Sequence, residues 1–380
     1  MKIDLKRLKQ VSEKWNEIES KFKAAPYNTP VNKDVEKDKF LKSYYSGFDY
    51  NPIFKYKPYP GYKTKKIKNF LNDLEPDVYL LENIYFTKAR NKLLSIESVR
   101  THDPDVITAM SLLCYGFPDA NLVSQATRIL NAQDEQCIDN GNNTSLGKLS
   151  SDDVALVIND IIESIGLEEW TALTVKHSNS NIAVNRIDKT IKVNESYRFT
   201  VNEVNRLLLH EIGVHLFRYE NGKRQPIKLF EQGFVDYLST EEGLAVITEE
   251  KSGLLSTSTI RKYCGRVLAA RLSINRSFYE VFNELSQRFD VDLSFNITAR
   301  AKRGFEQTGE PGVHTKDMVY LEGYIMLKDY LEKYPDRFDT LFLGKFGISD
   351  MDLVDELYKH EILNSPLFLP SALESYLLSQ

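Results

Sequence analysis

Apolar residues recur at helical spacing along much of this chain, beginning at the N-terminus. Over residues 3–24 they lie two to four positions apart, which is typical of a helix with one buried face. These positions are Ile3, Leu5, Leu8, Val11, Trp15, Ile18 and Phe22. The pattern predicts an N-terminal helix that packs one face against a larger body.

The segment that follows, residues 25–63, is rich in tyrosine, proline and lysine. Its prolines argue against long helices, and its aromatic residues favour a segment lying on the body of the protein. We therefore expect an N-terminal helix and wrapped arm over residues 1–64, and one large domain over residues 65–380. From residue 65 to about 165 helices are predicted in succession, interrupted at Pro104, Pro118 and the stretch 141–147, with a helix cap at Ser150 or Ser151.

The pattern changes after residue 170. Residues 170–178 and 181–194 favour strands, and a turn at Asn185–Asp188 makes the second stretch a predicted hairpin. Helical spacing returns at 200–220, and further helices are predicted at 240–250, 257–288, 316–333 and 349–360. The predicted fold class is α+β, a mostly helical body with a small antiparallel sheet.

Composition narrows the function classes. Hydrophobic residues make up 42% and charged residues 27%, as in an ordinary globular protein. The net charge of -5 gives no reason to expect a nucleic acid partner. We see no secretory signal and no run of about 18 apolar residues, so we expect a soluble, cytoplasmic protein that does not enter a membrane. The three cysteines lack the spacing of a thiolate zinc site.

Two of the six histidines fall in one window, His210-Glu211-Ile212-Gly213-Val214-His215, an HExxxH pattern. Zinc peptidases often place two histidines four residues apart on a helix, with a glutamate after the first. Five residues on a regular helix turn about 140° away from the starting direction, so both imidazoles cannot face one ion. Gly213 is the residue best able to permit a π-type bulge or an early helix end.

The residue types suit a Zn²⁺ site. Neutral imidazoles are common zinc ligands, three protein ligands leave a position for water, and Glu211 is placed to take a proton from that water. A third ligand is expected from the next helix, where Glu242 follows His215 by 27 residues and the small Gly243 would allow close approach to the histidine helix. Alternatively, Ser239 and Glu242 form a capping box, and Glu241 is a second candidate ligand.

At this point the sequence resembles a known family, the QEGLA-motif proteins that include the microtubule-associated tyrosine carboxypeptidases. The resemblance rests on the HExxxH window, on Asn221-Gly222 with Gln225-Pro226, and on Glu241-Glu242-Gly243-Leu244-Ala245. Weaker matches extend it over residues 30 to 330. It implies a zincin-like metallopeptidase catalytic domain over residues 65–380, with His210, His215 and Glu242 as zinc ligands and Glu211 as the catalytic acid. Glu241 departs from the glutamine of many members, which leaves the choice of carboxylate ligand open.

The expected activity is that of a zinc-dependent carboxypeptidase that releases a C-terminal residue, tyrosine in the family, from a peptide or protein. Candidate donors to the reacting oxygen are His314 and Tyr320. Candidate cations for a terminal carboxylate are Lys316, Arg300 and Arg303, which lie in motifs that the family shares. Two other interpretations are a metal-dependent amidase acting on a non-peptide substrate and a non-catalytic regulatory or binding protein that contains zinc.

Overall fold

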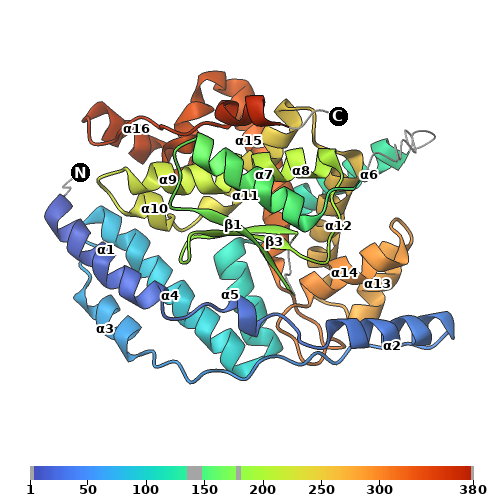
Figure 1. Cartoon of the computed structure of the whole chain (residues 1–380). Coiled ribbons are helices and arrows are strands. Elements are labelled where there is room, and N and C mark those ends of the chain that lie inside the picture. The colour runs from blue at the N-terminus through green and yellow to red at the C-terminus, as the bar shows by residue number, and fades with distance from the viewer. Residues whose placement is uncertain (1–3, 135–147, 177–180, 378–380) are drawn as a thin grey trace. The chain divides into compact units, whose positions relative to one another are not determined.

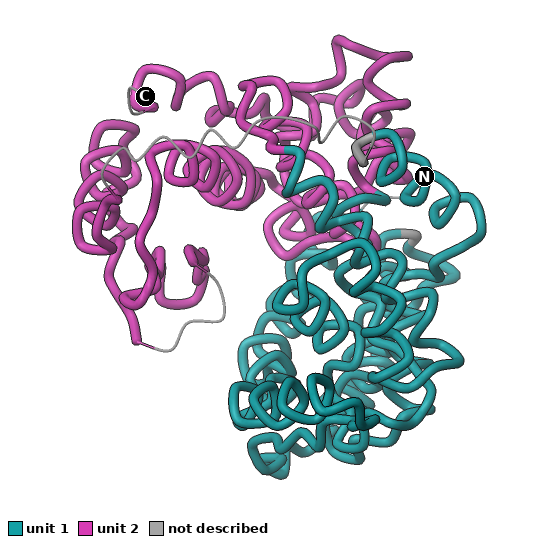
Figure 2. The backbone as a smooth tube through the Cα atoms, turned by 90° about the vertical axis from the view of Figure 1, so that its right-hand side faces the viewer, with its two compact units in different colours: residues 1–137, 257–322 teal, residues 138–256, 323–380 magenta. Residues whose placement is uncertain are grey.

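A computed structural model describes residues 4–134, 148–176 and 181–377. The chain divides into two compact units, coloured separately in Figure 2. The first unit contains residues 1–137 and 257–322, and the second contains residues 138–256 and 323–380. Neither unit is a single continuous segment. The sequence predicted a boundary between arm and domain at residue 64. The division into two units does not test that boundary, which stays a prediction.

Helices are the regular elements of the first unit's described residues, and loops connect them (Figure 1). In chain order they are α1 (Leu5–Glu19), η1 (Ala25–Tyr27), α2 (Lys33–Tyr45), α3 (Lys65–Asp73), α4 (Leu80–Thr101), α5 (Pro104–Tyr115), α6 (Ala120–Asp134), α12 (Thr257–Ser273), α13 (Phe278–Ser286), α14 (Val291–Ala301) and η3 (Thr315–Met318). The single helix predicted over 257–288 is wrong. It breaks before Ser277, whose hydroxyl accepts a hydrogen bond from the Glu280 backbone and so begins α13 as a new helix.

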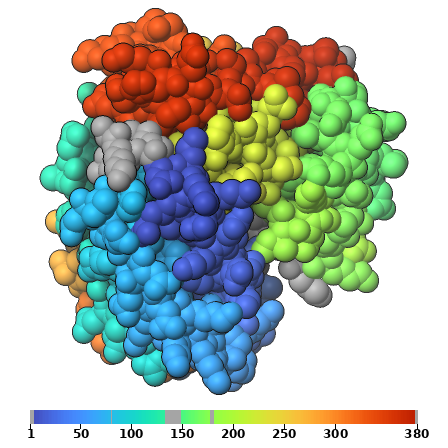
Figure 3. All heavy atoms as spheres, turned by 90° about the vertical axis from the view of Figure 1, so that its left-hand side faces the viewer, coloured from blue at the N-terminus to red at the C-terminus, as the bar shows by residue number. Residues whose placement is uncertain are grey.

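The predicted N-terminal helix is confirmed as α1. Its first turn is capped by the Asp4 carboxylate, which accepts a hydrogen bond from the backbone N–H of Arg7 at 3.0 Å. On its buried face, Trp15 packs against Phe70 of α3 and Tyr85 of α4, with ring centroids 5.7 and 6.5 Å away. Figure 3 shows α1 in dark blue against the lighter blue of α3 and α4.

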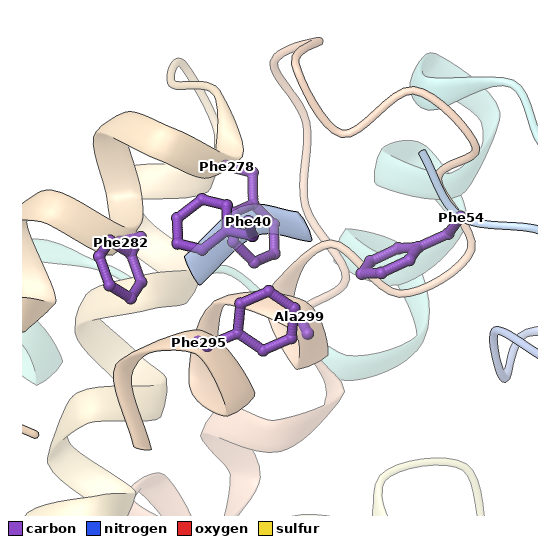
Figure 4. Packing of buried hydrophobic residues seen from close by; sticks show 6 residues of the cluster. All are labelled: Phe40, Phe54, Phe278, Phe282, Phe295 and Ala299. Atoms are coloured by element: carbon purple, nitrogen blue, oxygen red, sulfur yellow. The ribbon is translucent and has the colours of Figure 1, made fainter. Parts of the chain in front are cut away.

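The arm does lie on the body of the first unit, but it is not free of long helices. Helix α2 spans 13 residues there, because the stretch between Pro30 and Pro52 contains no proline and carries Phe40 toward the core. The core cluster that receives it consists of Phe40, Phe54, Phe278, Phe282, Phe295 and Ala299 (Figure 4). The arm therefore contributes two of the five buried phenylalanines of this cluster.

The second unit combines a small sheet with short helices. Its elements are α7 (Ser151–Ser164), β1 (Thr171–Val175), β2 (Ile182–Asn185), β3 (Thr190–Asn194), α8 (Val201–Leu207), η2 (Leu208–Leu216), α9 (Phe217–Lys223), α10 (Leu229–Gln232), α11 (Tyr237–Lys251), most of α15 (Val319–Lys333), η4 (Pro335–Arg337), η5 (Asp339–Leu343), η6 (Ile348–Asp350), α16 (Met351–Lys359) and η7 (Pro370–Tyr376). The α+β fold class and the cap at Ser150, which begins α7, are confirmed. The predicted break at 141–147 lies outside the described residues.

The sheet has the order β1-β3-β2. The predicted hairpin is confirmed, since β2 and β3 are antiparallel. The expectation of a purely antiparallel sheet is wrong, because β1 pairs with β3 in parallel. Helix α7 holds β1 in place through Asn159, whose side-chain amide bonds both the N–H and the C=O of Ala172. At the other edge of the sheet, β2 packs against η2, the segment that carries the histidines.

Among the described residues, no single helix is long and apolar enough to cross a membrane. Helices α5 and α6, which meet at a bend of 82°, together are long and apolar enough, by length and composition only.

Candidate metal centre

The two histidines lie on a widened helix. Helix α8 begins at Thr200 with a capping box and continues into η2, which is a π-helix, before α9 resumes regular α-helical geometry. Hydrogen bonds from residue i to residue i+5 enlarge each turn, so residues five apart return to the same face. The rings of His210 and His215 accordingly lie with centroids 4.9 Å apart. The predicted π-type distortion is confirmed.

A third donor atom comes from α11, which packs against η2. Oε2 of Glu242 lies 3.6 Å from Nε2 of His210 and 3.7 Å from Nε2 of His215. The capping-box interpretation of Glu242 is wrong, because α11 begins after Asp236 and Glu242 lies within the helix. Within the described part of the chain, this buried oxygen has no hydrogen-bond partner. Three donor atoms therefore converge on one point.

Glu211 lies beside this point. Its carboxylate and the two histidines each offer one donor atom, and all three atoms lie within 4.8 Å of one another. Burial raises the pKa of the Glu211 carboxyl above its ordinary value. A carboxyl whose pKa is raised toward neutrality is suited to accept and return a proton near pH 7.

Both imidazoles also contact carboxylates through their other ring nitrogen. Nδ1 of His210 lies 2.7 Å from Oε1 of Glu249, and Nδ1 of His215 lies 3.0 Å from Oε1 of Glu241. Sequence reasoning placed Glu241 among the candidate ligands and missed Glu249. The available signal was spacing, since Glu249 follows Glu242 by seven residues, two helical turns, and so shares its face.

Three buried or half-buried cations surround these acids, and none of them was predicted from the sequence. Nη1 of Arg206 lies 3.0 Å from Glu249, and Nη1 of Arg218 lies 3.2 Å from Glu241. The ammonium of Lys345 also pairs with Glu241. Lys345 follows Glu241 by more than one hundred residues, so only the fold brings the two together.

The charged groups around the site favour a positive charge at the point where the three donor atoms meet. Four carboxyl groups (Glu211, Glu241, Glu242 and Glu249) surround the point together with three basic side chains (Arg206, Arg218 and Lys345). Burial opposes protonation of His210, yet the neighbouring Glu242 and Glu249 raise the pKa of its imidazole to about 10. The protein thus favours a cation at this position.

The donor set and its spacing also fit one zinc ion. Ligands held tetrahedrally at about 2.1 Å from zinc lie roughly 3.4 Å from one another. The 3.6 and 3.7 Å separations between the Glu242 oxygen and the two imidazole nitrogens are close to that value. Two imidazoles with one carboxylate form a ligand set found in zinc hydrolases.

Comparison with known proteins places this chain in a family. The family model of the microtubule-associated tyrosine carboxypeptidases matches residues 38–377, which is most of the chain. The chain belongs to the microtubule-associated tyrosine carboxypeptidase family. The resemblance seen in the sequence motifs is therefore confirmed.

Individual relatives match a shorter stretch. A mouse protein named "Putative tyrosine carboxypeptidase MATCAP2" is 32% identical over 171 residues, 43% of this chain and 32% of the relative. Microtubule-associated tyrosine carboxypeptidase 1 from human is 32% identical over 167 residues, 42% of this chain and 34% of the relative. The rat protein of the same name is 30% identical over 166 residues, 42% of this chain and 34% of the relative. The matched stretch spans about a third of the length of these relatives.

The motif Asn221-Gly222 with Gln225-Pro226 has a structural role in this chain. The side-chain oxygen of Asn221 accepts hydrogen bonds from the backbone N–H groups of Leu367 and Phe368. Gln225 exchanges two hydrogen bonds with the backbone of Asn364. Between them, Gly222 lies so close to the backbone that an added Cβ would be 2.2 Å from the Phe230 carbonyl oxygen. The motif fastens the C-terminal segment to α9 and α10.

The candidate substrate-binding residues all belong to the first unit, whereas the donor atoms belong to the second. Arg300 and Arg303 are engaged with Asp317, at 2.5 and 3.2 Å. Burial lowers the pKa of His314 to about 3, so its ring is neutral at pH 7. Tyr320 stacks on Tyr263 with ring centroids 4.9 Å apart. A substrate-binding role for these residues and for the half-buried Lys316 stays a prediction.

Proposed function

We propose that this chain is a zinc-dependent hydrolase whose Zn²⁺ ion would be held by His210, His215 and Glu242. The convergence of one carboxylate oxygen and two imidazole nitrogens, with Glu211 beside them, supports this most strongly. Glu241 is better suited to a supporting role than to binding the ion, because its oxygens already contact His215, Arg218 and Lys345. Three protein ligands would leave a coordination position for the reaction.

Glu211 would carry the proton. A bound zinc ion would supply a Lewis acid that polarises the scissile carbonyl and lowers the pKa of water to about 7. Glu211 takes a proton from the attacking water and then delivers it to the leaving amine nitrogen. Burial of Glu211 supports this cycle, because a raised pKa makes its carboxylate a stronger base toward the attacking water.

Within the hydrolases, we propose a carboxypeptidase that acts on the C-terminus of a peptide or protein. Family membership and the relatives' names support this specificity, and those names make a C-terminal tyrosine the first substrate to test. Because the match spans about a third of each relative, the residue preference and the cellular partners are proposals too. A cytoplasmic location is likewise proposed from the sequence.

The proposal is tested with purified protein, its zinc content and a peptide library that varies the C-terminal residue. We expect one zinc per chain and release of a single C-terminal residue. Glu211→Gln keeps the size of the side chain but cannot accept the proton, so zinc should stay bound while turnover falls by roughly a hundredfold or more.

Turnover by Glu211→Gln equal to that of the wild type would remove Glu211 from the mechanism. Cleavage of non-peptide amides with no release from peptides would favour an amidase. A wild-type protein that binds zinc but cleaves neither substrate class would favour a binding or regulatory role. Failure to bind zinc would overturn the metal centre itself.

A further inference from the structure

Each imidazole of the centre is held between two carboxylates of the same helix. Glu242 faces Nε2 of both rings, while Glu249 and Glu241 face Nδ1 of His210 and His215 respectively. We infer that Glu241 and Glu249 are positioning residues that orient the two imidazoles for metal binding. This inference rests on the proposed zinc site and assigns a role to two acids outside the ligand set.

The chemistry of the contact determines the tautomer of each ring. An ionised carboxylate only accepts hydrogen bonds, so Nδ1 of His210 and of His215 must carry the proton. A ring that binds an ion is neutral, so its lone pair then lies on Nε2, which faces the oxygen of Glu242. A carboxylate behind a metal-binding histidine both fixes its orientation and makes it a stronger ligand.

A cation pairs with each of these buried acids. Lys345 pairs with Oε1 of Glu241, and Nη1 of Arg218 lies 3.2 Å from its Oε2. Arg218 is itself held rigidly, because its Nε and Nη2 donate to the backbone carbonyls of Leu341 and Phe346. Arg206 plays the matching part for Glu249, donating to the oxygen that contacts His210.

A stabilising role does not account well for this arrangement. Buried ion pairs often contribute little net stability, because removing two charges from water costs about as much as their attraction returns. Here the buried charges form two chains, cation to carboxylate to imidazole, and both chains end at the point where Glu242 lies. Such convergence is expected if the charged groups orient the imidazoles of the metal centre.

Helix α11 places the ligand and both supporting acids at a fixed spacing. Glu242 and Glu249 share a face two turns apart, and Glu241 lies one residue, about 100°, around the helix. Close contact fixes this helix against α15, since an added Cβ on Gly243 would lie 2.2 Å from the backbone carbon of Gly323. Helix α11 packs against η2 as expected from the sequence, although Gly243 itself makes its closest contact with α15.

The test measures zinc affinity in the full chain by competition with a chelator of known affinity. Glu249→Gln and Glu241→Gln preserve side-chain size but remove the charge that holds each imidazole. We expect each to weaken zinc binding by about 10- to 100-fold. The visible spectrum of the Co²⁺-loaded protein should also change, because a reoriented imidazole alters the ligand field. A purely structural role would lower the melting temperature of the metal-free protein and move neither readout.

Glu250→Gln is the matched control. Glu250 lies next to Glu249 on α11 but pairs with Tyr324 and Lys328, so zinc affinity should stay at the wild-type value. Should Glu241→Gln fail to fold because Lys345 is left unpaired, the double variant Glu241→Gln with Lys345→Met removes both charges and should fold with the same weakened affinity. Wild-type zinc affinity in the Glu249 and Glu241 variants would overturn the inference alone. A wild-type protein that binds no zinc would overturn the proposed function and this inference with it.

Discussion

Asp317 illustrates how single charges are held in the first unit. Its carboxylate accepts two hydrogen bonds from Arg300, at 2.5 and 2.8 Å, and one from Arg303 at 3.2 Å. Burial would raise the pKa of Asp317, but Arg303, Arg300 and Arg266 hold it well below 3.8. The folded protein therefore keeps this carboxylate ionised at a pH where the unfolded chain takes up a proton.

Asp317→Asn should consequently destabilise the protein in a pH-dependent manner. Removing one partner of a buried ion pair costs about 3 kcal/mol, so the variant should be less stable by that amount at pH 7. The stabilisation is complete above the unfolded pKa of about 3.8 and is lost as pH falls through the lower folded pKa. Urea unfolding of both proteins from pH 7 to pH 3 checks this. A stability difference that stays constant below pH 4 would contradict it.

At the scale of elements, the crossing of α11 and α15 depends on two glycines. A Cβ on Gly323 would lie 1.8 Å from the backbone oxygen of Ser239, and backbone atoms cannot move aside as a side chain can. The contact matters for the centre because α11 carries Glu241, Glu242 and Glu249.

Gly323→Ala should therefore separate the two helices and lower the free energy of unfolding by about 3 kcal/mol. Zinc affinity should fall with it. Gly213→Ala is the control for stability, because its added Cβ would meet only the end of the Leu373 side chain at 3.3 Å, and we expect a cost of less than about 1 kcal/mol. Urea unfolding measures both. Equal stability of Gly323→Ala and the wild type would show that the crossing is not tight.

At the scale of the whole molecule, the two units have different cores, and the second carries the candidate metal centre. The first unit is organised around the phenylalanine cluster in Figure 4, where Phe40 lies with its ring centroid 4.6 Å from Phe282 and 5.2 Å from Phe278. The second unit carries the candidate metal centre on η2 and α11.

Hydrogen exchange should distinguish the two units. Phe40→Ala leaves a cavity that costs about 3–5 kcal/mol, so amides of α13 and α14 should exchange faster. Added zinc should instead slow exchange in η2 and α11, because a ligand stabilises the state that binds it. Measuring both effects by mass spectrometry tests whether the units respond separately. An equal loss of protection in η2 and in α13 on Phe40→Ala would show that they unfold together.

Local chemistry explains what was predictable from the sequence. The apolar stripe of α1, the cap at Ser150 and the β2–β3 hairpin depend on residues close together in the chain, and all three were predicted. The HExxxH spacing likewise required a distorted helix if both histidines were to face one ion, and η2 provides this distortion as a π-helix. The motif set in addition identified the family.

Contacts between distant residues were decided only by the tertiary structure. Whether β1 pairs with β3 in parallel, and whether Gly243 meets η2 or α15, depends on packing partners far away in the sequence. Periodicity could not choose between Glu241 and Glu242, because neighbours on a helix differ by only about 100° in direction. The fold distinguishes them by turning Glu242 toward the imidazole Nε2 atoms and Glu241 toward Lys345, which lies 104 residues farther along the chain. The sequence by itself thus determined which chemical groups are present and their local conformation, and the tertiary structure determined which of them meet, because burial and charge pairing act through space.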